Sequence, residues 1–339
     1  MRNLLTDVTG VRVAHAENGG LMSGVTAILI DRPNTAVGCV TGGAPGTRGL
    51  SILAADSTND GVDAIVLSGG SAFGLDAAGG VMASLREAEV GFEIGGIRVP
   101  IVAQAITFDL LAGGESDWPG DDPVYWRLGR VAADSAQRLS SGHEFSLGSV
   151  GGGIGATTAD AKGGVGSASA RTSAGHTVAA IAVVNAIGTA LIDGGPHFWA
   201  GAYECEDEFG GLGWPQHISR EALNVQTKGG LVTATTIACV ATDAPLRKPE
   251  LARVLAMAND GYARALRPVH APLDGDTMFA VSVPDTRAPD RAITTPSDIT
   301  AIGTAAADCV ARAIARGVYL AGQPAGNYRG PPSYRDRFA

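Results

Sequence analysis

The sequence is poor in the residues that bind nucleic acid, anionic membranes or metal ions. Only three of its 339 residues are lysines, the formal net charge is −9, and no run rich in lysine and arginine occurs. Nucleic acid and anionic membranes are therefore poor partner candidates. The six histidines form no H-x-x-x-H or H-E-x-x-H pattern, so the sequence supports no zinc site, and we expect no metal or cofactor.

Cysteine pairs and long apolar runs are also missing. The four cysteines form no C-x-x-C motif, and most of them stand in apolar segments, as expected of small buried thiols. The most apolar stretch, Thr177–Ile192, is too short to span a bilayer. The first residues, MRNLLTDVTGVRVAH, lack the apolar core of a secretory signal. We therefore expect a cytoplasmic protein.

Glycine, in contrast, is abundant. Forty-eight glycines accompany 45% apolar residues and only 5% aromatics, a composition typical of an α/β protein whose loops are built around backbone groups. We find no internal repeat and expect one domain over residues 1–339. Apolar runs bounded by turn residues predict strands at Gly24–Ile30, Ala36–Val40, Ala64–Gly70, Thr177–Ile192, Thr235–Thr242 and Thr277–Val283.

Three segments have the pattern of helices, and one long interval has neither pattern. Helices are predicted over Ala72–Glu89, Leu246–Leu266 and Ser297–Arg316, the last with Ser297 and Asp298 as candidate N-cap residues. The interval Asp193–Gly230 is polar and rich in glycine, tryptophan and proline, which indicates a surface excursion or linker.

Several familiar enzyme motifs are incomplete or absent. GSVGGGIGATTADAKGGVGSAS has the glycine spacing of a dinucleotide site, but no amphipathic helix follows the glycines. No G-x-x-x-x-G-K-[ST] phosphate loop and no G-x-S-x-G nucleophile elbow are present. A dinucleotide enzyme and an α/β-hydrolase serine enzyme are therefore poor interpretations.

Four polar residues in glycine-rich or apolar surroundings are candidates for chemistry. Asp274 and Asp276 flank Gly275 just before a strand, either as a turn or as two carboxylates that face one pocket. Lys162 stands within the long Gly/Ala/Ser stretch. Asn185 interrupts an apolar strand, where its amide needs partners or serves a developing oxyanion. Singly, each is more often structural than catalytic.

A pair of threonines begins the strand Thr235–Thr242. Threonine suits strands, so these residues are either ordinary strand positions or include a nucleophile that a chain break would expose. Successive strand residues face opposite sides, so only one of Thr235 and Thr236 can point into a given site.

An ordered set of motifs resembles one family over nearly the whole chain. VTGVRVAH, GVTAIL, GGAPGTR, LSGGSAFGL, KGGVGSAS, VVNAIG, ATTIACVATDA, RPVHAPLDGDTMFAV and AAADCVARAI resemble the DmpA-type L-aminopeptidase/D-esterase family, which includes β-aminopeptidases and the nylon-oligomer hydrolase. The resemblance implies a four-layer α/β/β/α sandwich, shared with the ornithine acetyltransferases. It also implies a homo-oligomer, with a tetramer favoured, and a chain that cuts itself before a Ser or Thr.

The resemblance also assigns residues. It implies cleavage of the Ala234–Thr235 bond, rather than the bond before Thr233 or Thr236, into fragments 1–234 and 235–339. Thr235 would be the nucleophile, Asn185 would serve the oxyanion hole, and the remaining polar site would consist of Lys162, Asp274 and Asp276. The family often has Tyr at the position of Phe73, which would line the substrate pocket. Relatives usually have Asn at the position of Ala234.

This chemistry needs no histidine. A threonine at a chain start carries its own base, an α-amine with a pKa near ~8. The acidic loop resembles that of the nylon-oligomer hydrolase branch, which implies amide substrates, so we expect a small peptide, an amino-acid amide or an amide oligomer as substrate. Two other classes remain open: an acyltransferase working through an acyl-threonine, and an uncleaved, non-catalytic homologue.

Overall fold

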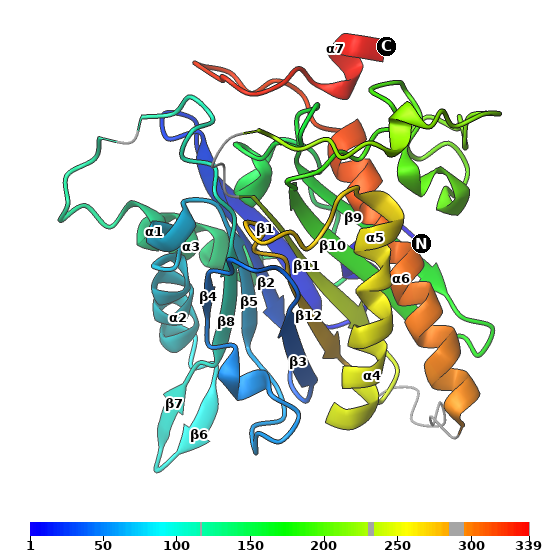
Figure 1. Ribbon diagram of the computed structural model, residues 1–339. Coiled ribbons are helices and arrows are strands. Elements are labelled where there is room, and N and C mark those ends of the chain that lie inside the picture. Colours follow the sequence, from blue (N-terminus) through cyan, green and yellow to red (C-terminus); the bar gives the residue numbers. More distant parts are fainter. Residues whose placement is uncertain (116, 230–233, 285–294, 339) are drawn as a thin grey trace.

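The computed structural model describes residues 1–115, 117–229, 234–284 and 295–338, and its centre is formed by two five-stranded sheets (Figure 1). The first sheet has the order β1-β2-β5-β8-β4 and the second β3-β12-β11-β10-β9. Their strands are β1 (Val11–Asn18), β2 (Ser23–Ile30), β3 (Thr35–Val40), β4 (Thr47–Arg48), β5 (Ala64–Ser68), β8 (Val102–Ile106), β9 (Val165–Arg171), β10 (Thr177–Asn185), β11 (Thr235–Thr242) and β12 (Thr277–Ser282). A separate hairpin joins β6 (Phe92–Ile94) to β7 (Ile97–Val99).

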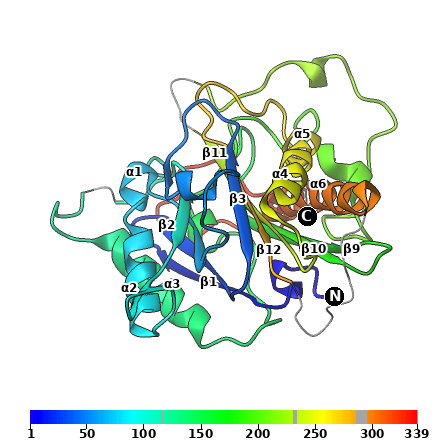
Figure 2. The same cartoon turned by 90° about the horizontal axis from the view of Figure 1, so that it is seen from below.

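Helices cover the outer face of each sheet, as Figures 1 and 2 show from two directions. The first sheet packs against α2 and α3, and the second against α4 and α6. The helices are α1 (Ser71–Gly74), α2 (Ala77–Glu87), α3 (Val124–Gln137), α4 (Lys248–Ala258), α5 (Asp260–Ala265), α6 (Pro296–Tyr319) and α7 (Tyr334–Phe338). This is the four-layer α/β/β/α sandwich that the motifs predict.

Side-chain alternation along the strands explains the layers. In β11 the residues Ile237 and Cys239 belong to the core between the two sheets, whereas Ala238 and Val240 belong to the core under α4 and α6. Both faces are therefore buried, and the strand is continuously apolar or small, as a fully covered strand must be. Within the described residues no helix is both long and apolar enough to cross a membrane.

Predicted strands agree with the structure to within two residues, with one exception. The predicted strand Thr177–Ile192 ends as β10 at Asn185. Beyond it the chain passes so close to the Arg267–Pro268 segment that a Cβ at Gly188 would lie 2.3 Å from the carbonyl oxygen of Pro268. The apolar pattern continues past Asn185 because this loop is buried, although it is not a strand.

The three predicted helices lie at the predicted positions, but two of them are each interrupted and form two helices. Residues 72–89 form α1 and α2, and residues 246–266 form α4 and α5. Asn259 lies at the second break and its side-chain amide donates to the carbonyl oxygen of Leu255 at 2.8 Å, which competes with the helical hydrogen bonds. The N-cap of α6 is Thr295 rather than Ser297, because Thr295 and Asp298 exchange hydrogen bonds in a capping box.

In the described part of the polar interval after β10, the regular elements are two short 3-10 helices, Trp199–Tyr203 and Glu221–Leu223. It leads towards β11, as a surface excursion would. Gly230, its last predicted residue, and Thr233 lie outside the described residues.

Candidate active site

The predicted nucleophile and the predicted oxyanion residue are neighbours across two strands. Thr235, the first residue of β11, pairs with Asn185, the last residue of β10. Directly opposed residues of an antiparallel pair project from the same face, with Cβ atoms about 5 Å apart. Both share their face with Ile237, so both side chains point into the layer between the sheets, where they are buried. The fold therefore brings these two predicted residues together.

Thr236 points to the other face, towards the helices. Its carbonyl oxygen accepts a hydrogen bond from the Tyr262 hydroxyl at 3.2 Å. Its own hydroxyl is buried and has no hydrogen-bond partner among the described residues. Of the two adjacent threonines, only Thr235 shares the layer of the other polar candidates.

The peptide bond before Thr235 is held by its carbonyl oxygen. The oxygen of Ala234 accepts a hydrogen bond from the backbone N–H of Gly275 at 2.9 Å and from the Thr235 hydroxyl at 2.5 Å. A Cβ at position 275 would lie 2.6 Å from Oγ1 of Thr235, so glycine is needed for this approach. Two donors on one carbonyl polarise it towards nucleophilic attack.

Asp276 fixes the backbone of this region. Its Oδ1 accepts the backbone N–H of Thr236 at 2.7 Å, and its Oδ2 lies 3.1 Å from the backbone nitrogen of His270 and 2.7 Å from Nδ1 of the same histidine. Asp276 therefore positions Thr236, the residue after the predicted nucleophile. Sequence reasoning missed His270, although it lies six residues before Asp276 in the same motif.

Asp274 has a different environment from Asp276. It is buried, its Oδ1 has no hydrogen-bond partner among the described residues, and its backbone forms a bridge with Ala234. Burial, reinforced by the charge of Asp276, raises the pKa of Asp274 to about 7, although Lys228 and His270 oppose the shift. A buried carboxylate oxygen without a donor among the described residues, beside the Ala234–Thr235 peptide bond, can accept a hydrogen bond from an amine.

Asn185 has a fixed amide. Its Oδ1 accepts from the backbone N–H of Thr157 at 3.0 Å and from Nζ of Lys228 at 2.9 Å, and its Nδ2 donates to the carbonyl oxygen of Phe108 at 2.8 Å. Two donors on one side and an acceptor on the other define which end is nitrogen. Nδ2 carries two hydrogens, so one remains for a further acceptor.

Lys162 does not reach the threonine through any described hydrogen bond. Its ammonium group donates to the carbonyl oxygens of Gly153, Ala156 and Gly163 at 2.7–3.0 Å, which uses all three of its hydrogens. Burial lowers the pKa of Lys162 to about 7, against the opposing charge of Asp109. Lys162 therefore holds the loop that contains Gly153 and Ala156. The residue that follows Ala156 is Thr157, which contacts Asn185.

A cavity of about 200 Å³ lies next to the hydrogen-bond partners of Asn185, although neither Asn185 nor Thr235 itself lines it. Its walls include the three residues that contact the Asn185 side chain (Phe108, Thr157 and Lys228) together with Asp109 and Arg329. Burial raises the pKa of Asp109 to about 6. Asp109 and Lys228 were not predicted. Lys228 is one of only three lysines, which was the available signal.

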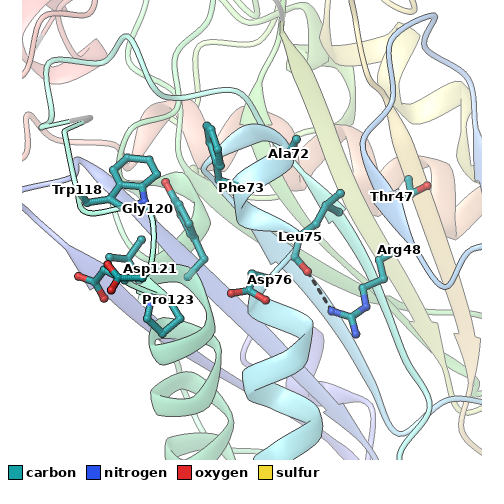
Figure 3. A pocket seen from close by; sticks show the side chains of 13 residues that line it. Thr47, Arg48, Ala72, Phe73, Leu75, Asp76, Trp118, Gly120, Asp121 and Pro123 are labelled. Carbon is teal, nitrogen blue, oxygen red and sulfur yellow. Dashed lines mark hydrogen bonds between the residues drawn. The ribbon is translucent and has the colours of Figure 1, made fainter.

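Phe73 lines a different, larger pocket of about 580 Å³ between β4, α1 and the start of α3 (Figure 3). Its ring is 60% exposed and packs edge-to-face on Trp118, with centroids 5.5 Å apart. This pocket is lined by none of the other five predicted site residues. Phe73 thus faces a pocket, but not the cavity beside Asn185.

Among the described residues, no three His, Cys, Asp or Glu side chains lie close enough together to hold a metal ion. The polar groups around Thr235 are instead carboxylates, amines, an amide and backbone N–H groups. This set can supply a hydroxyl nucleophile, donors for an oxyanion and partners for an amine.

Known proteins are similar to this chain in sequence and in fold. An uncharacterized aminopeptidase of Mycobacterium tuberculosis is 39% identical over 99% of this chain and 98% of its own length. A 6-aminohexanoate-oligomer endohydrolase of Kocuria sp. is 28% identical over 81% of this chain and 74% of its own length. The solved L-aminopeptidase D-Ala-esterase/amidase of Ochrobactrum anthropi, described as a variant of the Ntn-hydrolase fold, superposes with a TM-score of 0.63 at 20% identity, covering 95% of this chain and 87% of that one.

These similarities confirm the family predicted from the motifs. The model of peptidase family S58 matches residues 3–329, which is nearly the full chain. The chain belongs to peptidase family S58 and is a hydrolase of peptide or amide bonds.

Proposed function

We propose that this chain is a self-processing amide hydrolase that cuts its own Ala234–Thr235 bond and then uses Thr235 as an N-terminal nucleophile. The observation that carries the proposal is the contact at the scissile bond. The Thr235 hydroxyl lies 2.5 Å from a carbonyl oxygen that also accepts the Gly275 N–H. Nucleophile, carbonyl and a stabilising donor are already assembled in the uncut chain.

Self-cleavage then follows from these groups. Oγ1 of Thr235 attacks the carbonyl carbon of Ala234 and loses its proton, while the negative charge that develops on the oxygen is stabilised by the Gly275 N–H. The C–N bond breaks, the nitrogen takes the proton, and an ester forms between Ala234 and Thr235. Water hydrolyses this ester, which leaves a carboxylate on Ala234 and a free α-amine and hydroxyl on Thr235.

Turnover repeats the reaction on a substrate. The α-amine accepts the proton of the Thr235 hydroxyl as the oxygen attacks the substrate amide, and the protonated amine delivers it to the leaving nitrogen. The donor-free Oδ1 of Asp274 is suited to hold this amine, and the free hydrogen on Nδ2 of Asn185 to bind the oxyanion. Water then hydrolyses the acyl-threonine.

The substrate we propose is a short peptide, an amino-acid amide or an amide oligomer. The names of the relatives support this class, since they include an aminopeptidase and a hydrolase of 6-aminohexanoate oligomers. The cavity of about 200 Å³, whose walls include three residues that contact Asn185, is a candidate place for part of such a substrate.

Intact-mass measurement tests the proposal. The wild-type chain should give fragments 1–234 and 235–339, and Thr235→Ala should give one uncut chain with at least about 10³-fold less amide hydrolysis. Thr236→Val is the matched control and should still be cut, because its side chain faces the helices. An uncut wild-type chain that hydrolyses amides would rule out the amine mechanism, because Thr235 would have no free amine.

A further inference from the structure

Lys228 connects the segment before the scissile bond to the predicted oxyanion residue. Its ammonium group donates to the backbone oxygen of Asn185 at 3.0 Å and to its Oδ1 at 2.9 Å. Its backbone N–H donates to the carbonyl oxygen of Ile187 at 3.1 Å. Three hydrogen bonds therefore tie this residue to the end of β10, where Asn185 faces Thr235.

The charges around Lys228 explain why an ammonium group can stay there. Burial lowers the pKa of Lys228 to about 7, whereas the carboxylates of Asp274 and Asp109 oppose this shift and favour the charged form. Lys162 is a further cation near this group, because burial and then the charge of Lys228 lower its pKa. All three of its ammonium hydrogens are taken by backbone oxygens. Lys228 is thus the amine that remains available to the side chain of Asn185.

We propose that Lys228 is a positioning residue of the active site, which fixes and polarises the Asn185 amide beside Thr235 from the segment that self-cleavage turns into the end of fragment 1–234. The proposal rests on the proposed function. It also assigns Lys228 a role after cleavage: this residue stays docked on the end of β10 as part of the site.

The physical reason is the direction of the hydrogen bonds. A cation on Oδ1 draws electron density from the amide and makes the Nδ2 hydrogens stronger donors. It also stops the amide from turning over, because a reversed amide would present NH₂ to an ammonium group. Lys228 makes no described hydrogen bond to Thr235 or Ala234, so it acts through Asn185 and is not itself catalytic.

The first measurement is kinetic. Lys228→Met should lower kcat of the cut enzyme by roughly 10- to 100-fold, the scale of a lost charge-assisted hydrogen bond, with KM changed less than about threefold. Lys228→Arg, which keeps the charge and two donors, should recover part of the loss. Lys248→Met is the matched control, because Lys248 donates only to carbonyl oxygens of residues 52, 54 and 57.

A double-mutant cycle shows whether the effect passes through Asn185. In an Asn185→Ala background, Lys228→Met should cost less than about threefold in kcat. An equal loss in both backgrounds, or an unchanged kcat in Lys228→Met alone, would overturn the inference. The same cycle in melting temperature, measured on the uncut Thr235→Ala chain, needs no activity. If wild type is inactive while this cycle still shows coupling, the proposed function has failed and the Lys228–Asn185 contact has not.

Discussion

The two ends of the β10–β11 pair carry similar residues in different environments. At the far end from the site, the Thr242 hydroxyl donates to the carbonyl oxygen of Thr177 at 2.8 Å. The backbone N–H of Thr177 donates in turn to Oδ1 of Asp243 at 2.8 Å. Threonine and aspartate here close the end of a sheet, and these polar groups are paired within it.

At the other end, not every buried polar atom has a hydrogen-bond partner among the described residues. Thr235 and Asn185 face each other as Thr242 and Val178 do. Asp274, however, has a raised pKa and a buried oxygen for which the described residues supply no donor. Burial without pairing is costly unless a ligand or a new chain terminus supplies the partner. The two ends therefore cannot be distinguished by residue type alone. What distinguishes the predicted site end is the buried carboxyl group of Asp274, with its raised pKa and incomplete hydrogen bonding.

Among the tests that compare the two ends, the largest effect is expected from replacing the aspartate at the site end. Asp276→Asn should lower kcat by roughly 100-fold. The carboxylate accepts hydrogen bonds from Thr236 and His270, and the NH₂ group of asparagine would face one of these donors instead of accepting from it. Asp243→Asn at the far end is the matched control and should stay within about twofold of wild type. Equal losses in both variants would remove the distinction between the two ends.

A pH series gives an intermediate effect. In the uncut Thr235→Ala chain, the pKa of Asp274 is about 7, above its unfolded value of about 3.9, so the folded state binds the extra proton between these values. The free energy of unfolding should therefore fall as pH rises from about 4 to 7, by at most about 1.4 kcal/mol per pH unit from this group.

The matched variant for the pH series is Asp274→Asn in the same uncut background. It should lack this fall, and the two chains should differ most in slope between about pH 4 and 7. Chemical denaturation at several pH values measures this difference. Parallel curves would show that Asp274 titrates normally in the folded protein.

The smallest effect should come from Thr242→Val. The variant loses the bond to Thr177 and the one that the Ala244 N–H makes to the hydroxyl, so the free energy of unfolding should fall by about 1 kcal/mol. Because this end binds no reacting group, kcat should be unchanged. A fall in kcat at equal folded fraction would contradict the separation of the two ends.

Much of the frame could be predicted from the sequence. The strand Thr235–Thr242 was predicted with the bounds of β11, because small and apolar residues bounded by polar ones are a local signal. The helix breaks at residues 75–76 and 259 were missed, since apolar periodicity continues across them. The set Thr235, Asn185, Asp274 and Asp276 came from motif resemblance, and the fold gathers these four at one end of the second sheet.

The sequence by itself determined the family, the layers and the identity of the polar residues, because these depend on local patterns and ordered motifs. Only the tertiary structure decided how those residues are used. It directed the three ammonium hydrogens of Lys162 to backbone oxygens of a loop and two of those of Lys228 to Asn185. It also left one oxygen of Asp274 without a donor among the described residues. The reason is physical: burial and hydrogen bonds between residues some 40 positions apart set charge and pKa, and no local pattern encodes them.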